Sequence, residues 1–149
     1  MAPGGETGRG AGRVKPAGKR EVGRAAAIAA AVTLGYALLF GRRTDYAGHY
    51  MAGFGATLVL LAVPFAFAKK PLGWTAVAAA IALIAFGIYT EATWFQLAIF
   101  DPVDFCNQSL GACMAGLCLA GGMGSEELGI ELGFWGLLLI TGGFAYAYS

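Results

Sequence analysis

Polar side chains of the kind that bind ligands or move protons gather in the segment FDPVDFCNQSLG, residues 100–111. Asp101, Asp104 and Asn107 recur every three residues, and Gly111 follows four residues later, so on a helix they share one face. Ionisable groups at the edge of a bilayer are costly, and they persist when they pair with another group or serve a function. The segment therefore predicts a polar site whose partners lie elsewhere in the chain.

Two other stretches supply candidate partners. One is the loop and helix start after residue 40, and the other is a pair of polar positions in the apolar run between residues 72 and 100. Carboxylate, imidazole and amide groups can bond a polar headgroup, and arginines can balance the charge of the acids. The predicted pocket contains Asp45, His49, Glu91, Gln96, Asp101, Asp104 and Asn107, with Arg42 and Arg43 as charge partners.

The same residues offer little for metal binding or catalysis. The chain has one histidine, which argues against a zinc site. Glu91 and Asp104 could act as an acid–base pair on a lipid-linked substrate, yet no nucleophile motif accompanies them. Haem-attachment motifs and phosphate-binding glycine loops are also missing from the sequence. We therefore expect no metal and no cofactor, and we assign no catalytic residue.

Composition indicates which elements must position these groups. Of 149 residues, 58% are hydrophobic and 13% are charged, with a mean hydropathy of +0.65. These values favour an all-α, polytopic bundle of transmembrane helices over a water-soluble domain. The apolar segments cover about residues 25–40, 50–68, 72–100, 102–120 and 132–148. They predict five spans, or four if residues 102–120 form a re-entrant helix.

The fourth segment carries clear helix signals. Asp101 suits an N-cap, Pro102 the first helical position and Asp104 the third, since free N–H groups and the helix dipole favour acids there. Capping alone is the simplest role for Asp101. Ala112, Gly116 and Ala120 are four apart, a spacing of small residues that predicts close helix packing, and Gly111 is a further small residue. The packing positions are Gly111, Ala112, Gly116 and Ala120.

The basic residues predict the orientation. Six of the ten lysines and arginines precede residue 25, and Lys69 and Lys70 follow the second segment, against Arg42 and Arg43 on the other side. The positive-inside rule then places the N-terminus in the cytoplasm and the polar stretches outside. Residues 1–23 are expected to be a disordered basic tail, and residues 24–149 the transmembrane domain. The tail has no aromatic residue for base stacking, so we expect no nucleic-acid partner.

The order of these motifs resembles the VanZ-like family of small membrane proteins. The resemblance rests on Asp45-x-x-x-His49, Glu91-x-x-x-x-Gln96 and Asp101-x-x-Asp104-x-x-Asn107-x-x-x-Gly111, and it covers about residues 42–121. It implies a bacterial envelope protein in the inner (cytoplasmic) membrane. It does not imply a defined biochemical activity.

Three functions fit the sequence. The first is a VanZ-like protein whose outward pocket binds a lipid headgroup or a cell-wall precursor, with membrane lipids as partners. The second is an accessory subunit that packs against other membrane subunits. The third is a membrane enzyme acting on lipid-linked substrates.

Overall fold

A computed structural model describes residues 19–68, 73–93, 101–121 and 126–149, without the side chains of residues 19 and 90–92. Each of these ranges is helical over most of its length, which confirms the predicted all-α fold. The helices are α1 (Lys19–Leu39), α2 (Thr44–Phe67), α3 (Gly73–Thr93), α4 (Pro102–Leu119) and α5 (Glu126–Ala147).

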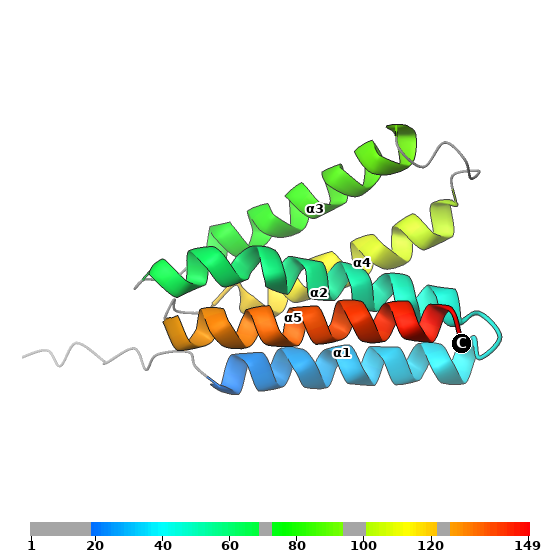
Figure 1. The fold of residues 1–149 in the computed structure, drawn as a ribbon, viewed down its shortest axis with the longest axis horizontal. Helices are drawn as coiled ribbons and strands as arrows, with labels where there is room; N and C mark the ends of the chain where they lie inside the picture. Colours follow the sequence, from blue (N-terminus) through cyan, green and yellow to red (C-terminus); the bar gives the residue numbers. More distant parts are fainter. Residues whose placement is uncertain (1–18, 69–72, 94–100, 122–125) are drawn as a thin grey trace, which may run out of the picture.

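Helix α2 occupies the centre of the bundle and contacts all four other helices. Helices α1, α3 and α5 run in one direction, and α2 and α4 run in the other (Figure 1). Helix α3 packs on α4 and α2 and diverges from α2 toward its own C-terminal end (Figure 1). One end of the bundle therefore collects the C-terminal ends of α1, α3 and α5 and the N-terminal ends of α2 and α4. We call this the motif end.

The first helix begins earlier than the sequence suggested. The basic tail was expected to be disordered through residue 23, but residues 19–23 belong to α1. Val22 is buried, and Arg24 donates a hydrogen bond from Nη2 to the Cys118 carbonyl at 3.1 Å. These contacts with the core and with the end of α4 stabilise a helical turn that composition alone did not predict.

The core is built on one face of α2. Large side chains recur along it at intervals of three or four residues, which is the spacing of a single helix face. The residues are Tyr50, Phe54, Leu58, Leu61 and Phe65, and all are buried. Leu119 of α4 and Leu128 and Leu132 of α5 complete the same cluster.

A second face of α2 packs against α5 through small residues spaced seven apart. Gly48 lies against Gly143, Gly55 against Gly136, and Ala62 against Gly129, in antiparallel order. A Cβ added at Gly136 would lie 2.7 Å from the Gly55 carbonyl oxygen and 2.8 Å from a Val59 methyl group. Glycine thus allows the two backbones to approach more closely than any side chain would permit.

Glycines also set the position of α4. A Cβ at Gly53 would overlap the Gln108 carbonyl, and one at Gly111 would overlap the Tyr50 carbonyl, so α2 and α4 touch backbone to backbone. On the other side of α4, Gly116 lies against Ala76 and Ala80 of α3. The remaining small positions follow the same pattern. Ala112 is buried beside Ala80, and the carbonyl of Ala120 lies under Gly73.

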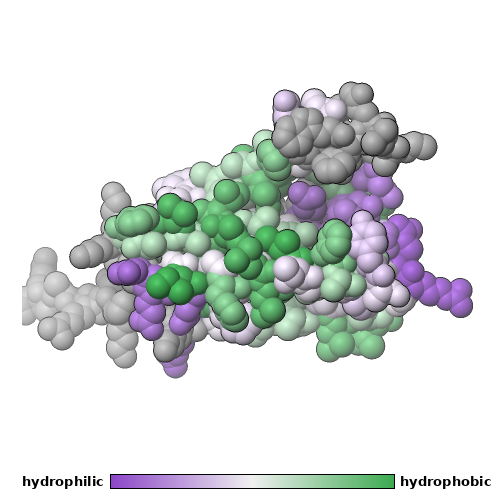
Figure 2. Space-filling model, in the orientation of Figure 1, coloured by the Kyte–Doolittle hydropathy of each residue, from purple (hydrophilic) through white to green (hydrophobic). Residues whose placement is uncertain are grey.

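The outer surface matches a lipid environment. Three helices are long and apolar enough to cross a membrane, over Arg20–Leu39, Thr44–Phe67 and Glu126–Ala147, and α3 adds a shorter apolar stretch over Gly73–Tyr89. Helix α4 is not among these spans, so the choice between five and four spans stays a prediction. Hydrophobic residues cover the middle of the face in Figure 2, and hydrophilic residues lie mainly toward its two ends. An apolar band of this size marks a surface that meets lipid or protein rather than water.

We expect Gly136→Ala to destabilise the bundle by about 1–3 kcal/mol, because the added methyl group has no space between α2 and α5. Gly133→Ala is the matched control on the same helix, since its Cβ would meet only the Ala62 methyl group, at 3.7 Å. The control should keep or slightly raise stability through its better helix propensity. Thermal unfolding in detergent, followed by circular dichroism, compares them. Equal melting temperatures would contradict the close α2–α5 contact.

Candidate functional site

The candidate site residues that the structure describes all lie at the motif end. Asp45 and His49 occupy the first two turns of α2, and Asp104 and Asn107 occupy the first two turns of α4. Two backbone contacts, of Gly53 with Gln108 and of Gly111 with Tyr50, hold these two helix starts together. Glu91 lies in the last turn of α3 with its side chain outside the described part, and Gln96 lies outside the described residues.

Asp101 caps α4 as the sequence predicted. Its side chain accepts a hydrogen bond from the Val103 N–H at 2.8 Å, and Pro102 occupies the first helical position. Asp104 follows in the first turn, where the helix dipole favours a negative charge. The cap fixes where α4 begins, and the backbone contacts with α2 fix which side chains of α4 face that helix.

His49 and Asp104 form the contact that joins α2 to α4 at this end. The distance from His49 Nε2 to Asp104 Oδ2 is 3.4 Å, an ion pair when the imidazole is protonated. The side chains are 37% and 24% exposed, so water still reaches the pair. The other carboxylate oxygen of Asp104 is buried without a hydrogen-bond partner among the described residues. This carboxylate therefore keeps one oxygen available for a further donor.

Arg43, the residue just before α2, belongs to a second charged group at the motif end. Its guanidinium donates to both carboxylate oxygens of Asp45, with Nη2 to Oδ2 at 2.8 Å, and it stacks over the Tyr46 ring with Cζ 4.1 Å from the ring centroid. These hydrogen bonds to Asp45 raise the pKa of Arg43 above its ordinary value, so the guanidinium stays charged. Arg43 also interacts electrostatically with Asp104. Both Arg42 and Arg43 are exposed.

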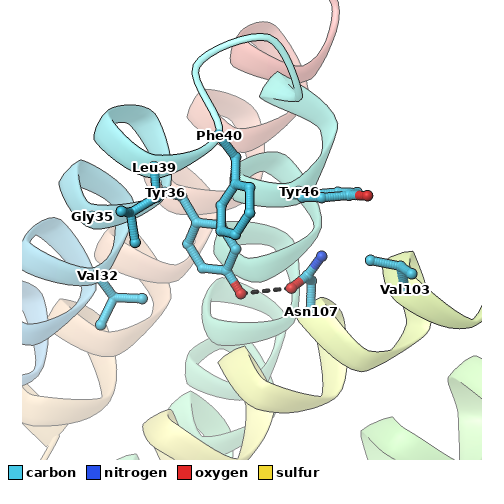
Figure 3. A pocket seen from close by; sticks show the side chains of 8 residues that line it. All are labelled: Val32, Gly35, Tyr36, Leu39, Phe40, Tyr46, Val103 and Asn107. Atoms are coloured by element: carbon cyan, nitrogen blue, oxygen red, sulfur yellow. Dashed lines mark hydrogen bonds between the residues drawn. The ribbon is translucent and has the colours of Figure 1, made fainter.

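Asn107 pairs with a residue that the sequence motifs did not include. The Tyr36 hydroxyl of α1 donates to Asn107 Oδ1 at 2.6 Å, and the asparagine is only 9% exposed. Figure 3 shows this bond crossing from α1 to α4. The predicted pocket is therefore divided: His49 contacts Asp104, while Asn107 is held by α1.

A hollow of about 330 Å³ lies beside His49, between α2 and α5. Asp45 and His49 give it a polar edge, and Phe144 and Tyr148 of α5 give it aromatic walls. A hollow with one polar edge and apolar walls suits a molecule that is itself polar at one end. Only the packing of α5 on α2 shows that Phe144 and Tyr148 line this hollow.

Metal binding finds no support in the described part of the chain. Among those residues, no group of three or more histidine, cysteine, aspartate or glutamate side chains is placed to hold an ion. The three cysteines, Cys106, Cys113 and Cys118, are free thiols along α4.

Asp101→Ala should destabilise the fold by about 1 kcal/mol, because the Val103 N–H loses its acceptor. Asp101→Ser is the matched control, since serine keeps a capping oxygen while removing the charge. Chemical unfolding in mixed micelles measures both variants. If serine and alanine destabilise equally, charge and not capping explains the effect of Asp101.

Comparison with models of protein families, with curated proteins and with solved structures found no match to this chain.

Proposed function

We propose that this protein is a VanZ-like integral membrane protein of the bacterial envelope that binds the polar end of a lipid or of a lipid-linked cell-wall precursor. The observation that carries the proposal is His49, which lines the hollow between α2 and α5 and is paired with Asp104 of α4. Its support is chemical: the His49 imidazole and the Asp45 carboxylate offer hydrogen bonds, and the aromatic walls offer apolar contact.

The surroundings of the pair fit an amphipathic ligand. The hollow lies between α2 and α5, two of the helices that can cross a membrane, so a bilayer lipid can reach it from the side. Arg43, at the start of α2, supplies a permanent positive charge at the motif end for a phosphate group. Carboxylates of Asp45 and Asp104 can accept hydrogen bonds from hydroxyl or amine groups. Phosphate, hydroxyl and amine groups are the groups that lipid headgroups and cell-wall precursors carry.

The proposal includes the orientation. Eight of the ten basic residues belong to the end opposite the motif end or to its flanking segments, so the positive-inside rule favours a cytoplasmic N-terminus in the bacterial inner membrane. The motif end then faces outside. The antiparallel order of α1 and α2 supports this, since it separates Arg20 from Arg42 by the length of α1.

A second function, an accessory subunit of a larger membrane complex, is supported by the surface of α3. This helix contacts α2 and α4 alone among the described helices, and it exposes large apolar side chains over its length. The exposed residues include Trp74, Ile81, Phe86, Ile88 and Tyr89. Such a face can pack on a partner helix as well as on lipid.

The binding proposal is tested by native mass spectrometry of the full chain after gentle extraction. We expect bound lipid, identified by its mass, whose amount falls in His49→Ala and in Asp104→Asn because each removes one side of the pair. Gly133→Ala should keep the lipid, since that position lies away from the motif end. A tightly bound protein subunit with no lipid, unchanged by His49→Ala, would replace the binding proposal with the accessory-subunit one.

The orientation is tested by labelling single cysteines in intact cells, in a chain whose native cysteines are replaced. A membrane-impermeant maleimide should label Arg42→Cys directly and Arg20→Cys only after permeabilisation. Labelling of both from outside, or in the reverse order, would overturn the cytoplasmic placement of the N-terminus.

A further inference from the structure

A second hollow, of about 430 Å³, lies at the motif end between α1 and the starts of α2 and α4. It shares no lining residue with the hollow beside His49. Its walls are mostly apolar or aromatic, and Asn107 lies at its base (Figure 3). We call it the Asn107 hollow. Its lining residues are Val32, Gly35, Tyr36, Leu39, Phe40, Tyr46, Val103 and Asn107.

Asn107 gives this hollow a chemical preference. The Tyr36 hydroxyl occupies Oδ1, which fixes the orientation of the amide and leaves Nδ2 buried without a hydrogen-bond partner among the described residues. In Figure 3 the amide nitrogen points toward the space between Tyr46 and Val103. A buried N–H₂ group without an acceptor is costly, so an acceptor oxygen entering the hollow would be stabilised.

The rest of the lining decides what kind of acceptor fits. Val32, Leu39 and Phe40 present apolar surface, so a neutral oxygen on an apolar molecule suits the space better than a free anion. Arg43, which stacks over the ring of the lining residue Tyr46, places a positive charge beside the hollow. A suitable ligand therefore has a chain, then a neutral acceptor, then a polar or anionic group farther out.

The depth of the hollow in the membrane matches the depth at which one such molecule carries its neutral acceptor. It is lined by the last turns of α1 and the first turns of α2 and α4, and α1 and α2 are spans whose ends must lie near the membrane interface. In a glycerophospholipid, the ester carbonyls lie between the acyl chains and the phosphate, at this interface. Arg42 and Arg43 continue the chain just beyond it, where the phosphate would lie.

We propose that the Asn107 hollow binds the glycerol-ester region of a membrane glycerophospholipid, with the Asn107 amide donating to an ester carbonyl. The acyl chain lies along Val32, Gly35 and Leu39 of α1. Tyr36 is a positioning residue, because it holds the amide in the orientation that presents Nδ2 to the lipid.

The test compares phosphatidylglycerol in its diester form with the diether analogue, which lacks the carbonyl groups. Native mass spectrometry of the full chain in detergent, titrated with each lipid, gives the two affinities. The wild-type protein should bind the diester about five- to tenfold more tightly, as expected for one hydrogen bond to a buried donor. Equal affinities of the wild-type protein for the two lipids would overturn the proposal.

Variants locate the effect. Asn107→Leu should abolish the preference for the diester, whereas Thr33→Val should keep it, since Thr33 lines a separate hollow between α1 and α5. Val103→Trp fills the Asn107 hollow from an exposed position and should weaken binding of both lipids even if Asn107→Leu fails to fold. Unchanged diester binding in Val103→Trp would exclude this hollow as the site. His49→Ala should leave the preference intact, which separates this result from the ligand proposed for the other hollow.

Discussion

The close contact of α2 with α5 and α4 is the constraint on which the rest of the structure depends. Small residues bring the backbones together: Gly48, Gly55 and Ala62 of α2 meet glycines of α5, while Gly53 meets the backbone of α4. In a membrane the hydrophobic effect contributes little to helix association, so close van der Waals packing must supply it. A larger side chain at the tightest of these positions would move a whole helix and not only its neighbours.

This packing determines which polar groups can meet. The crossing of α2 and α4 places His49 within 3.4 Å of Asp104, and the contact of α5 along α2 brings Phe144 and Tyr148 beside the same histidine. Helix α1 closes the other side, where Tyr36 reaches Asn107. The motif end therefore has two hollows, one on each side of the start of α2, with different chemistry. One has a charged edge, and the other has a single buried amide.

The two binding proposals rest on one order of chemical groups, from the loop at the motif end inward. Permanent charge stays at the loop, where Arg43 pairs with Asp45, and neutral donors lie deeper, where Asn107 is buried and Tyr36 half-buried. This change from charged to neutral groups with depth follows the order of groups in a lipid, from phosphate to carbonyl to chain. Burial of an unpaired charge at the deeper position would cost far more than burial of an amide, which explains why asparagine rather than a third aspartate can occupy it.

The sequence by itself determined the fold class, the approximate extent of the helical segments and the start of α4. Apolar segments, the Asp101-Pro102 start of α4 and the alternation of direction between successive helices depend on local chemistry and chain connectivity, so they could be predicted. The same alternation placed Asp45, His49, Asp104 and Asn107 at one end of the bundle. The start of α1 at Lys19 could not be predicted, because it depends on the contact of Arg24 with the end of α4.

Only the tertiary structure decided which side chains pair. Among 24 glycines many spacings recur, and nothing in the sequence singles out the seven-residue pattern that joins α2 to α5. Tyr36 is one of six tyrosines, and its bond to Asn107 depends on how α1 is rotated against α4. Rotation and depth are set by packing over whole helices, since a turn of a few tens of degrees exchanges one neighbour for another. Local sequence signals carry no information on that rotation.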